Sequence, residues 1–181
     1  MKKITRRDIF MLVYQEAPNF ADSVTHKDEE EIGWKVCINS YFEPVLVKLL
    51  IPKDAYRTWY KNKKYEKYSK HRCSKAKVLG FYSYYTGKEV TEQYKNGNCY
   101  AYSLRDNSFR YIPGDWVKPR WAYIENTIYY SLSQKVCDSG IHYFKTKESA
   151  YMWADLHVTN HVVFISCSPR HNTYRGMVEY L

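Results

Sequence analysis

Long apolar runs are missing from this 181-residue sequence. A membrane-spanning helix needs roughly 20 consecutive apolar residues, and no stretch comes close to that length. The N-terminus begins with basic residues, as a secretory signal does, but its apolar run covers only 9–13 and polar residues follow at once. We therefore expect a protein that is neither membrane-spanning nor secreted and that stays inside the cell that makes it.

Cysteines are few and scattered. The sequence has five, an odd number, whereas small secreted scaffolds carry dense, even sets that pair as disulfides. We expect free thiols in a reducing compartment. No sequence signature surrounds any cysteine or histidine, so the sequence does not predict a catalytic Cys–His pair.

Glycine is also scarce, and seven residues leave little material for a phosphate-binding loop. The best-spaced pair of metal-ligating side chains is His157 and His161, four residues apart. Residues 158–160 are poor helix formers, however, and no carboxylate completes a His-Glu-x-x-His motif. We therefore predict no metal site, no cofactor and no set of catalytic residues.

Tyrosine, by contrast, is abundant: there are 20, beside five Trp and seven Phe. Aromatic side chains suit pleated sheets, so this composition favours strands. The polar tip of tyrosine also suits wet interfaces with protein or nucleic acid. With 45% hydrophobic residues and no low-complexity linker, the chain is expected to fold as a single domain over residues 1–181.

Positive charge is concentrated in one stretch. The formal net charge is +9, and residues 57–77 hold nine Lys or Arg against one acid, Glu66. We predict that this stretch is a basic insert or loop. Aromatic residues lie within it or at its edge: Tyr56, Trp59, Tyr60, Tyr65 and Tyr68.

Two interpretations of the basic stretch stay open. It can be a solvated loop whose lysines keep the chain soluble and whose tyrosines pack onto the domain. It can instead be a surface for a polyanion such as nucleic acid, with cations for phosphates and rings for bases, although no known nucleic-acid-binding motif accompanies it. The second interpretation nominates six residues: Lys61, Lys63, Lys64, Lys67, Lys70 and Arg72.

Hydrophobic periodicity predicts an α+β fold, mostly antiparallel sheet. Strands are expected at 34–38, 45–51, 76–82, 99–104, 141–144, 162–167 and 174–181. One clear helix is predicted from Lys147 to about His157, capped by Thr146. A second helix, capped by Thr5 and ending before Pro18, has weaker support, and a strand is nearly as plausible there.

Turn signals mark the connections between these elements. Clusters of Gly, Asn, Asp, Thr and Pro predict turns at 86–87, 96–97, 106–107, 113–115 and 138–140. Residues 53–60 are expected to form one or two helical turns.

Three stretches of the chain, in order, follow one family's pattern. They are Val47–Arg57, Arg72–Leu79, and Cys137–Phe144 followed by Thr146 and Glu148–Ala150. In the last, a Cys and a Gly precede an Ile-His-aromatic-aromatic strand, and a helix follows. The chain thereby resembles an uncharacterised domain family of nucleocytoplasmic large DNA viruses and some phages. The resemblance covers roughly 47–153 and implies a viral origin but no activity, and the basic stretch departs from its pattern.

A second likeness starts from the same strand and helix. Gly140–Phe144, Ser149-Ala150 and Trp153 are similar to the nicotinamide-pocket motif of ADP-ribosyltransferases of the poly-ADP-ribose polymerase type. That similarity implies that Trp153 stacks on nicotinamide, that Tyr143 lines the pocket, and that Glu179 stabilises the developing oxocarbenium charge. The motif departs from the family in its spacing, which is one residue short, and in lacking an earlier-strand histidine for the ribose.

Two hypotheses for function follow. The first is a virus-encoded, non-enzymatic binding or structural protein of the host cytoplasm or the virion. It would contact a viral or host protein through its tyrosine-rich surface and a polyanion, such as nucleic acid, through its basic stretch. The second is an ADP-ribosyltransferase-like domain that binds NAD or ADP-ribose. The enzyme requires one concave pocket joining Tyr143, Trp153 and Glu179, whereas the binding protein requires those residues to be packed or in an interface.

Overall fold

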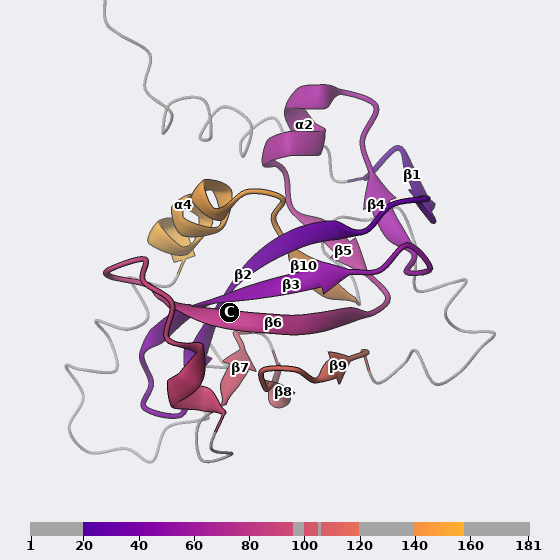
Figure 1. Ribbon diagram of the computed structural model, residues 1–181. Helices are drawn as coiled ribbons and strands as arrows, with labels where there is room; N and C mark the ends of the chain where they lie inside the picture. Colours follow the sequence, from indigo (N-terminus) through magenta and orange to yellow (C-terminus); the bar gives the residue numbers. More distant parts are fainter. Residues whose placement is uncertain (1–19, 96–99, 105, 120–139, 158–181) are drawn as a thin grey trace, which may run out of the picture.

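The computed structural model describes residues 20–95, 100–104, 106–119 and 140–157 (Figure 1). These residues form an α+β fold of two antiparallel sheets and two α-helices, which confirms the predicted fold class. The larger sheet has the strand order β8-β7-β2-β3-β6-β9, and the smaller sheet has the order β1-β4-β5-β10.

The elements have the following bounds. The larger sheet consists of β2 (Glu31–Asn39), β3 (Pro44–Ile51), β6 (Ala76–Ser83), β7 (Ala101–Ser103), β8 (Asp106–Tyr111) and β9 (Trp116–Val117). The smaller sheet consists of β1 (Ser23–Thr25), β4 (Arg57–Trp59), β5 (His71–Cys73) and β10 (Ile141–Tyr143). The helices are α2 (Lys63–Tyr68), the 3₁₀ helix η1 (Thr91–Tyr94) and α4 (Lys147–His157).

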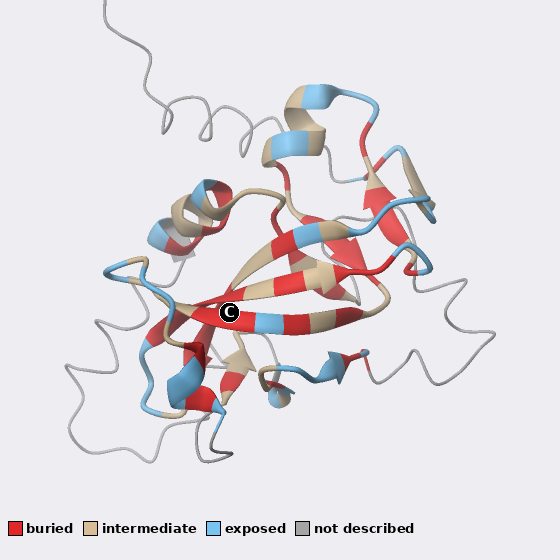
Figure 2. Ribbon diagram, viewed as in Figure 1, coloured by how far each residue is buried: buried red, intermediate tan, exposed pale blue. Residues whose placement is uncertain are grey.

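Strand β3 lies at the centre of the fold, between two apolar clusters. Val45 and Val47 belong to the larger cluster, whereas Leu46 belongs to the smaller one, and all three are buried. Because successive side chains of a strand point to opposite faces, a strand buried on both faces has a continuous apolar sequence. Figure 2 shows this central strand as mostly buried along its length.

The two clusters connect the sheets and the C-terminal helix. The larger cluster brings Ile51 of β3 together with Cys73 and Ile141 of the smaller sheet. The smaller cluster lies beneath α4, whose buried Ala150 and Ala154 belong to it. A two-hydrogen-bond bridge between Trp34 and Phe144, each bond 2.7 Å, joins β2 to the end of β10. Strand β10 therefore holds both sheets together.

The turn into β10 and the start of α4 follow from local sequence. Gly140 has a φ of 130°, a conformation that favours glycine, and a Cβ atom there would lie 3.4 Å from Cβ of Arg72. The hydroxyl of Thr146 accepts a hydrogen bond from the backbone N–H of Ser149 at 3.1 Å, as an N-cap does. Helix α4 has its predicted bounds.

Two predictions of local structure are wrong. Residues 53–60 form a turn followed by β4 rather than helical turns, because Arg57 and Thr58 are buried and pair with β1. Asp106 begins β8 instead of a turn, and it pairs with Ser103 of β7.

The basic stretch at 57–77 is also not a loop. It supplies β4, α2, β5 and the first residues of β6. The predicted helix before Pro18, the turn at 96–97 and the strands at 162–167 and 174–181 lie outside the described residues, and β7 covers the middle of the strand predicted at 99–104.

Candidate polyanion-binding surface

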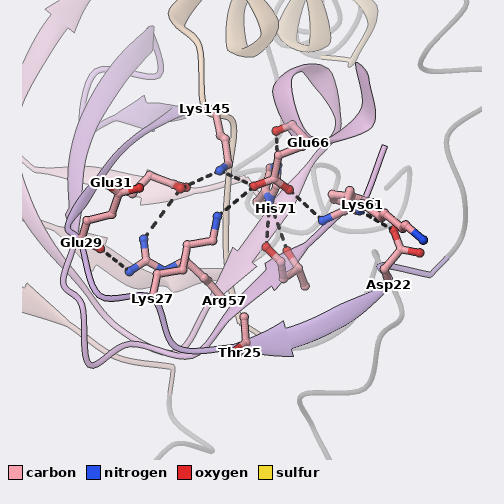
Figure 3. Close-up of polar contacts among 12 residues, drawn as sticks. Asp22, Thr25, Lys27, Glu29, Glu31, Arg57, Lys61, Glu66, His71 and Lys145 are labelled. Carbon is pink, nitrogen blue, oxygen red and sulfur yellow. Dashed lines mark hydrogen bonds and ion pairs between the residues drawn. The ribbon is translucent and has the colours of Figure 1, made fainter. Parts of the chain in front are cut away.

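A cluster of charged side chains lies beneath α2 and anchors it to the rest of the fold (Figure 3). We call it the charge network, and its members are Lys27, Glu31, Arg57, Glu66 and Lys145. Its centre is Lys145, whose Nζ lies 2.6 Å from Oε2 of Glu31 and 2.6 Å from Oε1 of Glu66. Because Glu31 starts β2 and Lys145 follows β10, these two contacts tie α2 to both sheets.

Glu31 is held from three directions. The hydroxyl of Tyr143 donates to its Oε1 at 2.8 Å, and the guanidinium of Arg57 lies 3.7 Å from its Oε2. Arg57 is fully buried and donates through one guanidinium nitrogen to the carbonyl oxygens of Glu29, at 2.8 Å, and Pro52, at 3.3 Å. A buried guanidinium needs such partners, since an unpaired buried charge is costly.

Glu66 turns its carboxylate inward from α2. Besides Lys145, it contacts Nζ of Lys27 at 3.1 Å and accepts a hydrogen bond from the backbone N–H of Tyr60 at 2.7 Å. Glu66 was the one acid of the basic stretch, so its contacts with the interior leave the solvent side of α2 without a carboxylate of its own.

His71 of β5 lies directly behind α2. Its Nε2 is 2.8 Å from the carbonyl oxygen of Glu66, and its Nδ1 is 3.1 Å from the carbonyl oxygen of Thr58. The ring also contacts Tyr60 edge-on, with centroids 5.1 Å apart, and Tyr143 at 5.5 Å. Burial and the charge of Lys145 lower the pKa of His71, although Glu66 opposes them.

The electrostatics of the network favour its charged form. Burial alone would raise the pKa of Glu31 and of Glu66, but hydrogen bonds led by those from Lys145 outweigh it and lower both pKa values. Burial would lower the pKa of Lys145, but its two carboxylate partners raise it on balance. The carboxylates and the ammonium are therefore ionised around neutral pH.

Exposed lysines lie on α2 and directly before it. Lys61, Lys63 and Lys67 are exposed, and Lys64 and Lys70 are half-buried. The side chain of Asn62 caps the helix by accepting from the backbone N–H of Lys64 at 2.9 Å. We call the exposed trio, Lys61, Lys63 and Lys67, the basic α2 face.

Arg72, the sixth nominated residue, is not part of this face. It is fully buried in β5, where its backbone N–H donates to the hydroxyl of Thr58 and its side chain passes Gly140. The prediction that it lies on the surface for a polyanion is therefore corrected. Residues at 71–73 alternate neither in polarity nor in burial, so sequence periodicity could not have shown that this arginine is inside.

Of the residues of the ADP-ribosyltransferase likeness that the structure describes, Tyr143 and Trp153 belong to different apolar clusters. Tyr143 is fully buried in the larger cluster, whereas Trp153 packs against Phe144 beside the smaller one, with ring centroids 6.1 Å apart. A small hollow next to Trp153 is lined by Phe144 and His142 but not by Tyr143. Glu179 lies outside the described residues.

The remaining candidate groups are the cysteines, the metal-ligating side chains and the helices. Of the five cysteines, the described Cys37 and Cys73 are free and buried, and burial raises the pKa of both, that of Cys37 to about 12. Within the described ranges, no group of three or more His, Cys, Asp or Glu side chains could hold a metal ion. His161 lies outside those ranges. No helix in the described part of the chain is long and apolar enough to cross a membrane.

Sequence reasoning missed the charge network. Its contacts join residues 79 and 114 positions apart in the chain, Lys145 with Glu66 and with Glu31. Only a weak indication of the charge network was available in the sequence, namely that the charged residue Lys145 directly follows an apolar strand.

Comparison with known proteins gives one match. No curated protein and no solved structure matches the chain. A model of a family of unknown function, DUF5758, matches residues 18–150, which include β1 to β10, α2 and the start of α4. The chain therefore belongs to the DUF5758 family.

Proposed function

We propose that this chain is a non-enzymatic binding protein whose basic α2 face contacts a polyanion such as nucleic acid. The observation that carries the proposal is the separation of charge across α2. The carboxylate of Glu66 is bound by Lys145, Lys27 and the Tyr60 backbone on the inner side, whereas the basic α2 face points to solvent.

The lysines of α2 repel one another. Lys63 and Lys67 are four residues apart on a helix, where like charges are destabilising by about 0.2–0.5 kcal/mol. The helix has six residues and no buried member, so its own hydrogen bonds cannot hold it against that repulsion. The charge network and the packing of Tyr65 against Tyr60 and Ala21 hold it instead. A polyanion would relieve the repulsion and release counterions.

Binding is favoured over catalysis because the charged groups in the interior contact one another. Lys145 forms one ion pair with Glu31 and one with Glu66, each at 2.6 Å, and Tyr143 donates to Glu31. Structural ion-pair networks shift pKa values in this way without acting on a substrate.

A viral origin, and a viral or host protein as a further partner, are part of the same proposal. The viral origin is supported by the ordered resemblance of 47–57, 72–79 and 137–150 to proteins of large DNA viruses. A protein partner is supported by Tyr41 and Tyr85, which are 71% and 72% exposed and are of the residue type that interfaces favour.

The test is retention on immobilised heparin. Lys61→Glu, Lys63→Glu and Lys67→Glu are combined in one variant of the full chain. We expect this variant to elute at clearly lower salt than the wild type, because the ionic contacts that retain the protein are reversed.

The matched control reverses three exposed lysines elsewhere, Lys53, Lys88 and Lys95, and so changes the net charge equally. It should elute close to the wild type. If both triple variants elute together, retention reflects net charge alone and the basic α2 face is not a binding surface.

A further inference from the structure

A second surface with cations and exposed rings lies on the larger sheet. Strand register places four side chains in one row across β2, β3, β6 and β9, because Ile32 pairs with Leu50, Leu50 with Lys77, and Lys77 with Trp116. Trp34 and Lys48 form the neighbouring pair on the same face. We call this set the outer sheet face; its members are Ile32, Trp34, Lys48, Leu50, Lys77 and Trp116.

The outer sheet face is partly exposed to solvent, whereas the opposite face of the same strands packs into the larger cluster. The residues next to the row in sequence, Leu49, Val78 and Val117, point into the larger cluster and are at most 7% exposed. In contrast, Trp116 is 54% exposed and Ile32 is 36% exposed. Helix α4 covers the end of this side at the smaller cluster, against which Trp34 also packs. Figure 2 shows the contrast in β9, where an exposed residue precedes a buried one.

Cations accompany the rings. Nζ of Lys77 lies 6.0 Å from the centroid of the Trp116 ring, and Nζ of Lys48 lies 5.7 Å from that of Trp34. Nζ of Lys147, from α4, lies 5.5 Å from the Trp34 ring on the same side of the sheet. Two ammonium groups therefore lie near the Trp34 ring and one lies near the Trp116 ring.

The backbone that carries Trp116 is anchored to β6. Two backbone hydrogen bonds join the turn before Trp116 to Val78. The N–H of Gly114 donates to the carbonyl oxygen of Val78 at 2.8 Å, and the N–H of Val78 donates to the carbonyl oxygen of Asp115 at 2.9 Å. Gly114 has a φ of 90°, which suits a tight turn. An exposed ring on a rigid strand loses little freedom when a second ring stacks on it.

We infer that the outer sheet face binds single-stranded nucleic acid, with a base stacked on Trp116 and phosphates beside Lys48 and Lys77. Flat rings flanked by cations are how sequence-tolerant single-strand-binding proteins hold their ligand. A duplex has its bases stacked and paired, so it cannot offer a base to Trp116. The inference rests on the proposed function in taking the polyanion to be nucleic acid, and it adds a surface separate from the basic α2 face.

The experiment measures binding of the full chain to a labelled oligothymidylate and to a duplex of the same length. Trp116→Ala should weaken single-strand binding about tenfold and change duplex binding less than twofold. Trp116→Phe keeps a ring and should recover most of the affinity. Tyr85→Ala removes a ring elsewhere that is more exposed, 72% against 54%, and should leave single-strand binding unchanged.

Each contrary outcome is distinct. Equal binding of single strand by Trp116→Ala and the wild type would overturn the inference, as would an equal loss in Trp116→Ala and Tyr85→Ala. Self-association through this face, with no preference for single strands, would make it a protein interface and would also overturn it. Loss of heparin retention in the Lys61, Lys63 and Lys67 variant tests the basic α2 face separately, so either proposal can fail alone.

Discussion

The two sides of α2 use charge in opposite ways. On the inner side, Glu66 and Lys145 form a 2.6 Å ion pair, and each is at most 19% exposed. On the solvent side, Lys61, Lys63 and Lys67 are exposed, and no carboxylate of α2 faces them. The same helix thus contributes one charge to stability and presents others to solvent. Burial and partners, rather than residue type, separate a structural charge from a candidate binding charge.

The interior contacts also explain why α2 is stable as a helix. Six residues with several lysines would not be helical alone in water. The contacts of Glu66 with the charge network stabilise the helix, which its exposed lysines do not. A substitution that disrupts the charge network should therefore also unfold α2 and displace the basic α2 face.

The largest effect is expected from Lys145→Ala, which leaves the Glu31 and Glu66 carboxylates facing each other across the network. Removing one partner of a largely buried ion pair should lower the free energy of unfolding by about 2–4 kcal/mol. In a chain of this length that lowers the melting temperature by about 5–15 °C. Thermal or urea unfolding measures it.

Lys95→Ala serves as the control for that change, since Lys95 pairs with Glu92 at the surface. Exposed pairs contribute about 0–1 kcal/mol, so this variant should melt close to the wild type. Similar losses in both variants would contradict a special role for the charge network.

A smaller effect is expected in acid. Because the folded pKa values of Glu31 and Glu66 lie below their ordinary value of 4.5, the stability that they contribute is present above about pH 4.5 and is lost as the pH falls through the folded values. His71, whose pKa is lowered from 6.5, adds a loss that begins as the pH falls below about 6.5. Melting temperatures between pH 7 and pH 3 measure the sum.

Glu66→Gln isolates the carboxylate part of this acid response. The amide cannot titrate, so the variant should start less stable at pH 7 and should lose less on going below pH 4.5. A decline as steep as that of the wild type would contradict the assigned role of Glu66.

Local patterns in the sequence predicted α4 and the strands β2, β3, β6, β7 and β10, but not β1, β4, β5, β8 or β9. Alternation in β2 and the continuous apolar run of β3 are properties of neighbouring residues, and the hydroxyl of Thr146 marks the start of α4 within three residues of its partner. Strand β4 was missed because its basic sequence gave no apolar alternation. Its burial depends on pairing with β1 and β5.

The candidate site could be predicted only in part. The lysines of the basic α2 face were nominated because charge density is visible in sequence. Whether Arg72 points inward, and whether Glu66 cancels or spares the neighbouring lysines, depends on contacts with distant residues such as Lys145. Hydrophobic periodicity along the sequence does not reveal contacts between residues that are far apart in the chain.

The most direct test of charge separation across α2 is the salt dependence of affinity for a single-stranded oligonucleotide. Lys61→Gln, Lys63→Gln and Lys67→Gln together remove three charges. If these residues contact phosphates, the slope of log affinity against log salt should become shallower by about 2. The same three changes at Lys53, Lys88 and Lys95 should leave the slope unaltered. An unchanged slope in the α2 variant, or equal changes in both variants, would contradict the proposal that the solvent side of α2 binds a polyanion.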